Sequence, residues 1–426
     1  AVGHAGHGHS PDSTYHGFHD TSWWRPTSPA ARFGEAWSGA GGLWKRRNKI
    51  PDFDATVVER IRKSGAIIMG KTNVPEAAMW VETYNYVYGR TRNPYDLSRG
   101  VGGSSGGEGA IVGSGASPFG MGSDVGGSIR YPAAFNGVPG HKPTGGRVPG
   151  YGHWPEAHGP IAWYCTFGPM ARRVADLAPL MNLVQGPDGK DTIVEDHGPV
   201  SPESVDRKKL RVFYFESNGM ARVNADVRRA VDMCAGALHH EGLAVEYWRP
   251  AGVNRSLEIW QAGMSQNPHP FVEIMGDGEA ISLMKETLLF ILRQGKITLP
   301  GLATSLVEKP GQLFAGRNRK MIALGDDLRR RIEERLGADG VLICPVFSTP
   351  APKHGYVWAD LLGIGYSGLF NVMGFPSTVV PVYYNEGGLP VSVQIVAARW
   401  NDHLTLAAAA MIEEIFGGWK PPAKIG

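Results

Sequence analysis

Cysteine is scarce in this chain of 426 residues, which contains only Cys165, Cys234 and Cys344. The three lie far apart and show no CxxC spacing, so they fit free buried thiols in a reducing compartment better than a disulfide framework. No apolar run reaches the roughly 18 residues that a membrane-spanning helix needs. The N-terminus also lacks the basic and apolar regions of a signal peptide. We therefore expect a soluble, cytoplasmic protein.

An excess of charge of one sign is also missing. The chain has 43 basic and 40 acidic residues, for a formal net charge of +3. A balance this even gives no electrostatic basis for nucleic acid binding. Hydrophobic residues make up 42% of the chain, so a large core is available and global disorder is not expected. The length suits one large α/β domain or two ordinary ones.

The first 40 residues differ in composition from the rest of the chain. They hold 5 of the 14 histidines, and helical or strand periodicity is absent there. These are His4, His7, His9, His16 and His19. No carboxylate or cysteine pattern completes a metal-ligand set around them. We expect residues 1–41 to form an atypical, poorly ordered segment and residues 42–426 to form the folded domain, with no bound metal.

Hydrophobic patterning becomes regular from Asp52 onward. Helices are predicted around residues 55–61, 225–239 and 404–416, and residues 255–340 are expected to be mainly helical. Predicted strands cover residues 66–69, 210–215, 244–248, 341–346, 379–383 and 391–396. The alternation indicates an α/β fold with a largely parallel or mixed sheet. Residues 283–299 are rich in leucine, which indicates a core or groove-lining helix, or alternatively an apolar surface for acyl chains or a membrane face.

One motif is rejected. Residues 65–72 fit the nucleotide-binding pattern G-x-x-x-x-G-K-[ST] letter for letter. That pattern needs a loop whose N–H groups wrap a phosphate, followed at once by a helix. Here the four middle residues read as a buried strand, and Pro75 disfavours helical geometry at Val74. We expect no nucleotide at this site.

Two glycine- and serine-rich segments carry the chemistry. They are residues 102–107 and 122–130, and they are separated by a mixed apolar stretch rather than by linker sequence. Val125, Gly126 and Gly127 offer consecutive backbone N–H groups immediately before Ser128, and glycine lets the backbone approach a substrate closely. An amide hydrolase needs a nucleophile and donors for the oxyanion of the tetrahedral intermediate. We predict Ser128 as the nucleophile.

The residues that flank and assist this serine are also predicted. Asp124 and Arg130 are expected to pair with each other and hold the turn, rather than act on substrate. No Ser-His-Asp triad is legible, and Ser128 does not lie in a G-x-S-x-G elbow. Another group must relay the proton, and Ser104 in the first glycine-rich turn is the candidate.

These residues resemble the amidase signature. The likeness extends from about residue 42 to the end of the chain, which makes it far more specific than one short motif. It rests on Gly102-Gly103-Ser104-Ser105-Gly106-Gly107-Glu108, Gly126-Gly127-Ser128-Ile129-Arg130, Gly70-Lys71-Thr72-Asn73-Val74-Pro75, Asn371-Val372-Met373-Gly374-Phe375-Pro376 and Gly388-Leu389-Pro390-Val391-Ser392-Val393-Gln394. Within the family, Met79-Trp80 and Tyr88-Gly89-Arg90 are most similar to the fatty acid amide hydrolase branch.

The resemblance implies a fold and a mechanism. The fold is a single α/β domain, a large mixed sheet flanked by helices on both faces. The mechanism is of the Ser-cisSer-Lys type, with acyl-enzyme formation on Ser128, proton relay through Ser104 after a cis peptide, and an oxyanion hole at Val125, Gly126 and Gly127. Met79 and Trp80 would line an apolar substrate pocket. No cofactor is implied.

One part of the family pattern is missing. The family's lysine lies in a segment of the form G-x-P-x-x-x-K-[DE], upstream of the position that matches Gly42-Leu43-Trp44. No such segment occurs, and the first lysine of the chain is Lys45. Losing a general base typically lowers the rate by about 10²–10⁴-fold.

Three functions therefore stay open. The first is an amidase that cleaves small or apolar acyl or aryl amides. The second is an inactive amidase-fold protein that lacks its catalytic lysine. The third is the glutaminase subunit of a tRNA-dependent amidotransferase, which would require partner subunits. For the first, a small-molecule amide is the expected partner, and a homodimer is a candidate assembly.

Overall fold

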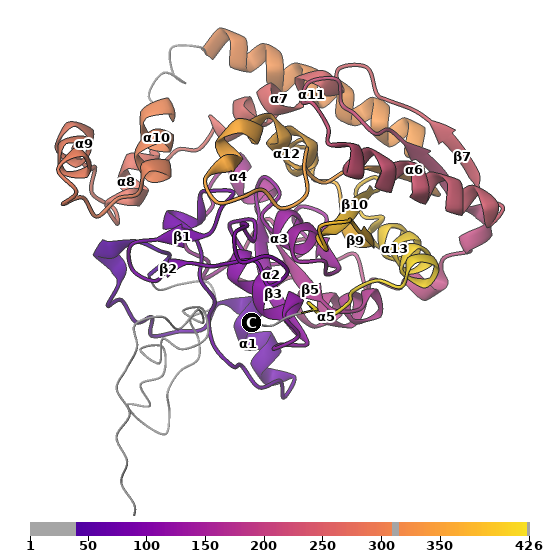
Figure 1. The fold of residues 1–426 in the computed structure, drawn as a ribbon, viewed down its shortest axis with the longest axis horizontal. Helices are drawn as coiled ribbons and strands as arrows, with labels where there is room; N and C mark the ends of the chain where they lie inside the picture. The colour runs from indigo at the N-terminus through magenta and orange to yellow at the C-terminus, as the bar shows by residue number, and fades with distance from the viewer. Residues whose placement is uncertain (1–39, 309–314, 424–426) are drawn as a thin grey trace, which may run out of the picture.

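The computed structural model describes residues 40–308 and 315–423 (Figure 1). The expectations for residues 1–41, including those for the five clustered histidines, fall almost wholly outside the described residues. The largest hydrophobic cluster of the described residues lies on the central sheet.

An eight-stranded mixed sheet forms the centre of the molecule. Its strand order is β3-β5-β4-β9-β10-β8-β6-β7. β6 pairs in parallel with β7 and β8, whereas the other neighbours pair antiparallel. The strands are β3 (Phe119–Asp124), β4 (Gly140–Lys142), β5 (Thr166–Ala171), β6 (Arg211–Tyr214), β7 (Ala244–Tyr247), β8 (Gly340–Pro345), β9 (Ser377–Tyr384) and β10 (Pro390–Val396). A separate two-stranded sheet pairs β1 (Tyr84–Asn85) with β2 (Gly89–Arg90).

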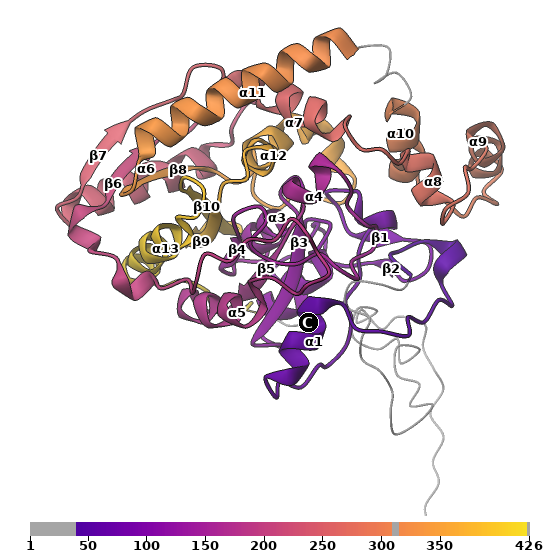
Figure 2. The same ribbon diagram turned by 180° about the vertical axis from the view of Figure 1, so that it is seen from behind.

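Helices cover both faces of the sheet, as the two views of the ribbon show (Figures 1 and 2). Successive residues of β4 make this explicit, because side chains alternate between the faces of a strand. Gly140 packs on Ala133 of α3, whereas His141 hydrogen-bonds Asp402 of α13. The helices are α1 (Thr56–Lys63), α2 (Gly106–Gly113), α3 (Arg130–Phe135), α4 (Pro160–Tyr164), α5 (Leu177–Val184), α6 (Ala225–His240), α7 (Ser256–Met264), α8 (Phe271–Met275), α9 (Leu283–Ile291), α10 (Leu299–Glu308), α11 (Ala315–Leu336), α12 (Ile364–Val372) and α13 (Asp402–Phe416).

Most of the predicted elements are confirmed within a residue or two. The exception among the strands is residues 66–69, which belong to neither sheet. Ile67 and Met69 are exposed there, while Ala66 and Ile68 pack on a core cluster. The prediction of a buried strand was wrong because no strand of the described residues pairs with the segment and its apolar side chains are at most partly buried. The nucleotide-binding motif that was rejected would need a helix directly after Thr72, and the structure has none at that position.

The helices α8, α9 and α10 lie to one side of the layered body (Figures 1 and 2). α8 and α10 pack on Leu43 and Ala77 of the body. On α9, by contrast, Leu283 is the buried residue, and Met284, Leu288 and Ile291 are exposed. The expectation of a core helix over residues 283–299 is therefore wrong for α9, which presents an exposed apolar surface.

Two expectations from composition can be checked. The cysteines Cys165, Cys234 and Cys344 are free and buried, as predicted. Within the described residues, no helix has both the length and the apolar character that crossing a membrane requires.

Candidate active site

Ser128 lies in the five-residue loop between β3 and α3, and its side chain is half-buried. The loop has no space for larger residues before the serine. A Cβ on Gly127 would lie 2.1 Å from the Tyr131 ring, and one on Gly126 would lie 2.9 Å from the Trp260 ring. Gly127 also has a φ of +122°, which side chains rarely adopt. Glycine at both positions therefore follows from the packing of the loop.

Asp124 holds this loop in place from the end of β3. Its carboxylate accepts hydrogen bonds from the backbone N–H groups of Gly127 at 2.7 Å and Ile129 at 3.0 Å. The Arg130 guanidinium donates to the same carboxylate at 2.9 and 3.0 Å, and both side chains are fully buried. Burial opposes ionisation of the Asp124 carboxyl, but the charge and hydrogen bonds of Arg130 hold its pKa well below the usual range.

Two residues from the C-terminal part of the chain complete this buried network. Arg130 donates to the side-chain oxygens of Asn371 on α12 and Gln394 on β10. Asn371 in turn donates to the Asp124 carboxylate at 2.9 Å. The sequence reasoning placed both residues in family-like segments but gave them no role. The one available signal was an amide side chain, Gln394, in a predicted strand that is mostly apolar.

Ser104 lies in the second loop, which leads into α2. Its side chain is buried, and the Gly103–Ser104 peptide is cis, as the resemblance implies. The N–H of Ser105 donates to the Ser128 carbonyl at 3.3 Å, so the two glycine-rich segments are in direct contact. The Ser105 hydroxyl is engaged by the backbone of Ser123 in β3. Ser104 therefore stays the candidate for proton relay.

The predicted oxyanion donors are not equivalent. The N–H of Gly127 is already donated to Asp124 at 2.7 Å. Val125 uses its carbonyl oxygen rather than its N–H group, since that oxygen accepts a hydrogen bond from the Trp260 indole at 2.9 Å. Among the proposed donors, the N–H groups of Val125 and Gly126, together with that of Ser128, are therefore better candidates than that of Gly127.

Lys142 is a buried residue that the sequence reasoning missed. It ends β4, and its Nζ donates to the Pro143 carbonyl at 2.9 Å. Burial, reinforced by the charge of Arg130, lowers the pKa of Lys142 to about 7. The two lysines closest to the missing family segment lie elsewhere. Lys45 donates to the Gly276 carbonyl, and Lys49 faces Asp277, both between α8 and α9.

The two residues predicted for the substrate pocket lie in different clusters. Met79 packs against the cluster that joins α8 and α10 to the body. Trp80 packs against the cluster that contains Ile129 and Tyr131, next to the Ser128 loop. The carbonyl oxygen of Trp80 would lie 2.3 Å from a Cβ on Gly103, so its backbone directly abuts the Ser104 loop. Trp80 therefore contacts the Ser104 loop and the cluster beside the Ser128 loop, whereas the contacts described for Met79 lie in the cluster of α8 and α10.

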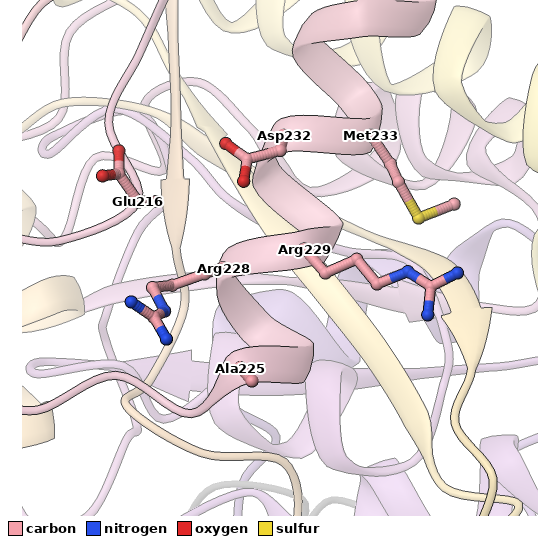
Figure 3. A pocket seen from close by; sticks show the side chains of 6 residues that line it. All are labelled: Glu216, Ala225, Arg228, Arg229, Asp232 and Met233. Atoms are coloured by element: carbon pink, nitrogen blue, oxygen red, sulfur yellow. The ribbon is translucent and has the colours of Figure 1, made fainter.

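Two other kinds of site are relevant to function. Among the described residues, no cluster of three or more His, Cys, Asp or Glu side chains could hold a metal ion. A surface groove lies along α6, lined by Glu216, Ala225, Arg228, Arg229, Asp232 and Met233 (Figure 3). Its acidic and basic side chains are mixed, and none of them belongs to the loops that carry Ser104 or Ser128.

Comparison with known proteins places these features in context. A sequence profile described as Amidase matches residues 39–406. Human fatty-acid amide hydrolase 2 is 37% identical over 399 residues, which cover 90% of this chain and 73% of that protein. A glutamyl-tRNA(Gln) amidotransferase subunit from Methanosarcina barkeri is 31% identical over 384 residues, covering 86% and 78%. The structure of 6-aminohexanoate cyclic dimer hydrolase superposes with a TM-score of 0.76 at 26% identity, covering 88% and 81%.

Proposed function

Since this chain belongs to the amidase family, we propose that it hydrolyses carboxylic amides through an acyl-enzyme on Ser128. The observation that carries the proposal is the contact between the two serine loops. Ser105 N–H binds the Ser128 carbonyl, and Asp124 fixes the Ser128 loop through two backbone hydrogen bonds. Such an arrangement holds a nucleophile and its proton relay in one rigid frame.

The proposed reaction has two steps. In the first, the Ser128 Oγ attacks the amide carbonyl carbon, and its proton passes by way of Ser104 to the leaving nitrogen. The developing oxyanion is stabilised by the N–H groups of Val125, Gly126 and Ser128. In the second step, water attacks the ester on Ser128 and releases the carboxylic acid. The products are an acid and an amine or ammonia.

The substrate class follows from the apolar surroundings. Trp80 packs on the cluster beside Ser128, and Met79 on the cluster beneath α8 and α10. We propose small or apolar acyl or aryl amides as substrates. The human relative is named a fatty-acid amide hydrolase, which supports an apolar acyl group. The amidotransferase subunit from Methanosarcina barkeri is less similar, so a glutaminase role is the weaker proposal.

One observation favours a second candidate function. The chain contains no lysine before Lys45, and Lys45 and Lys49 face the connection between α8 and α9. The alternative is an inactive protein that keeps the amidase fold and the serine loops but lacks the base that the family uses.

A fluorophosphonate probe distinguishes the two. It would be incubated with the purified chain, with Ser128→Ala and with Ser114→Ala, and the adduct mapped by mass spectrometry. Ser114 is the control because its hydroxyl bonds the Ile111 carbonyl at the end of α2. The amidase proposal predicts an adduct on Ser128 in the wild type and in Ser114→Ala, and none in Ser128→Ala. A folded wild-type protein without adduct would support the inactive scaffold.

A further inference from the structure

The peptide bond between Val125 and Gly126, just before Ser128, is held at its carbonyl end. The Val125 carbonyl oxygen accepts a hydrogen bond from the Trp260 indole N–H at 2.9 Å. A trans peptide is planar, and its C=O and N–H groups point in opposite directions. Because this bond is trans, the contact that fixes the carbonyl also fixes the direction of the Gly126 N–H, which points away from the indole.

The indole of Trp260 is itself held by close packing. Trp260 belongs to α7, and its ring packs on glycines of two other segments. A Cβ on Gly126 would lie 2.9 Å from the ring, and a Cβ on Gly368 of α12 would lie 2.8 Å from it. A ring in such close contact with the backbone of two elements has little room to turn. The indole N–H is therefore a rigidly placed donor.

The next peptide bond of the loop differs from this one, because both of its ends are occupied. The N–H of Gly127 donates to the Asp124 carboxylate, and the Gly126 carbonyl accepts from the Tyr131 hydroxyl. The N–H of Gly126, in contrast, has no hydrogen-bond partner among the described residues. Gly126 thus offers a backbone donor beside Ser128 that is unoccupied and whose direction is set by a side chain of another element.

We propose that Trp260 is a positioning residue for amide hydrolysis, whose indole aims the Gly126 N–H at the oxyanion that forms when Ser128 attacks the substrate. Trp260 acts through the peptide bond and touches none of the reacting atoms. The inference rests on the proposed amidase function and adds to it a residue 135 positions beyond Val125. Because the oxyanion develops only in the transition state, a misdirected donor lowers kcat and leaves substrate binding nearly unchanged.

Two changes at Trp260 separate its hydrogen bond from its packing. Trp260→Phe removes the indole N–H together with part of the ring. Replacement of Trp260 by 3-benzothienylalanine puts a sulfur atom in place of the N–H group and keeps nearly the same ring shape. Trp248→Phe is the matched control, because the Trp248 ring packs on Phe213 and follows β7, at the edge of the sheet opposite β3.

Hydrolysis of an acyl p-nitroanilide gives kcat and KM for each protein. Removing a whole oxyanion donor lowers kcat by about 10²–10³-fold, and a donor that stays but is no longer aimed should cost less. We therefore expect kcat to fall by about 10-fold to 100-fold in both Trp260 proteins, with KM changed by less than about twofold. The control should keep both constants. A fall in Trp260→Phe alone would assign the effect to packing and overturn the inference, as would an unchanged kcat in both proteins.

A measurement without turnover separates this inference from the proposed function. Valine labelled with ¹³C at the carbonyl and glycine labelled with ¹⁵N make only Val–Gly peptide bonds visible in a carbonyl-to-amide NMR correlation. The chain has four such bonds, after Val2, Val101, Val112 and Val125, and Val125→Ile identifies the last by removing its signal. We expect the benzothienyl replacement to shift the Val125 carbonyl signal and leave the other three in place.

The two measurements fail independently. An unmoved Val125 carbonyl signal would overturn the inference even if the wild type is an active amidase. A shifted signal in a protein that hydrolyses no amide and does not react with the fluorophosphonate supports the positioning of the loop by Trp260, and counts against the proposed function alone.

Discussion

Asp124 is the residue on which the geometry of the nucleophile loop depends. Its charge neutralises Arg130, and its oxygens orient the N–H groups on either side of Ser128. Replacing it with asparagine leaves Arg130 buried without a counter-charge, which typically costs about 3–5 kcal/mol. We expect Asp124→Asn to lose stability of this order in urea denaturation. We also expect its labelling by the fluorophosphonate to slow at least tenfold.

A matched control for this prediction is Asp339→Asn. Asp339 also pairs with an arginine, Arg211, but both side chains are more than 40% exposed. Exposed pairs contribute little, so this variant should unfold at nearly the wild-type urea concentration. Equal losses in the two variants would show that the buried pair has no special role.

Lys142 gives a prediction about pH. Its folded pKa is lowered to about 7 by burial and by Arg130, whereas an unfolded lysine titrates near 10.4. Between these values the unfolded chain holds a proton that the folded chain has released, so a rise in pH favours folding. The slope is about 1.4 kcal/mol per pH unit for one proton. Below pH 7 both states are protonated, and this dependence vanishes.

The measurement is the difference in unfolding free energy between the wild type and Lys142→Met, taken from urea titrations at pH 6, 7, 8 and 9. We expect the difference to be constant from pH 6 to 7 and then to shift in favour of the wild type. Groups common to both proteins cancel in the subtraction. A constant difference over the whole range would mean that Lys142 keeps an ordinary pKa.

The chemistry of single residues was predictable from the sequence where it depended on neighbours along the chain. Ser128, the flanking glycines and the Asp124–Arg130 pair all lie within seven positions. Asn371 and Gln394 lie more than 240 positions from Arg130, and nothing local in the sequence assigns them as its partners. Lys142 was missed for the same reason, because its burial depends on strands that are distant in sequence.

At the scale of elements, the turn before α2 is defined by close contact. A Cβ on Gly103 would lie 2.3 Å from the Trp80 carbonyl oxygen and about 3 Å from the next backbone atoms. Gly103→Ala therefore requires the backbone of one segment to move. We expect a loss of about 1–3 kcal/mol, as for other overpacked sites, and markedly slower labelling of Ser128.

Gly70→Ala serves as the control for this variant. Gly70 has no heavy atom within 4 Å of its ideal Cβ position, and its φ lies outside the range that favours glycine. An alanine there should leave the melting temperature and the labelling rate near the wild-type values. If Gly103→Ala behaved in the same way, the contact with Trp80 would be unimportant for the loop.

Element prediction succeeded where burial on both faces gave short, mostly apolar runs, as in β8, in residues 379–383 of β9 and in β10. It failed for residues 66–69 and for α9, where apolar residues are exposed. In both cases the sequence pattern records only that a side chain is apolar. Whether another element covers it depends on the tertiary arrangement, which local patterning does not contain.

For the whole molecule, buried ionisable groups set the pH of greatest stability. Lys142 favours folding increasingly above pH 7, because its folded pKa is low. Burial raises the pKa of Cys165, Cys234 and Cys344, whereas unfolded thiols ionise near pH 8.5. Above that pH the folded chain holds three protons that the unfolded chain has lost, so stability falls and outweighs the contribution of Lys142.

We therefore expect maximal stability between about pH 7 and 9, measured by urea denaturation under reducing conditions. Replacing the three cysteines with alanine should move the maximum toward higher pH, because only the contribution of Lys142 then remains in that range. A maximum that stays in place in the triple variant would contradict the assignment of the alkaline loss to the buried thiols.

The strand order has a consequence for the time at which activity arises during synthesis. β9 and β10 lie between two groups of strands that are made earlier, β3-β5-β4 and β8-β6-β7. β10 also supplies Gln394, and β9 follows directly after α12, which carries Asn371. The side chains of these two residues form hydrogen bonds with Arg130 and Asp124. A ribosome must therefore translate almost the whole chain before the sheet can become continuous. Because domains fold as units during synthesis, a nascent or truncated chain would carry Ser128 without the frame that orients it.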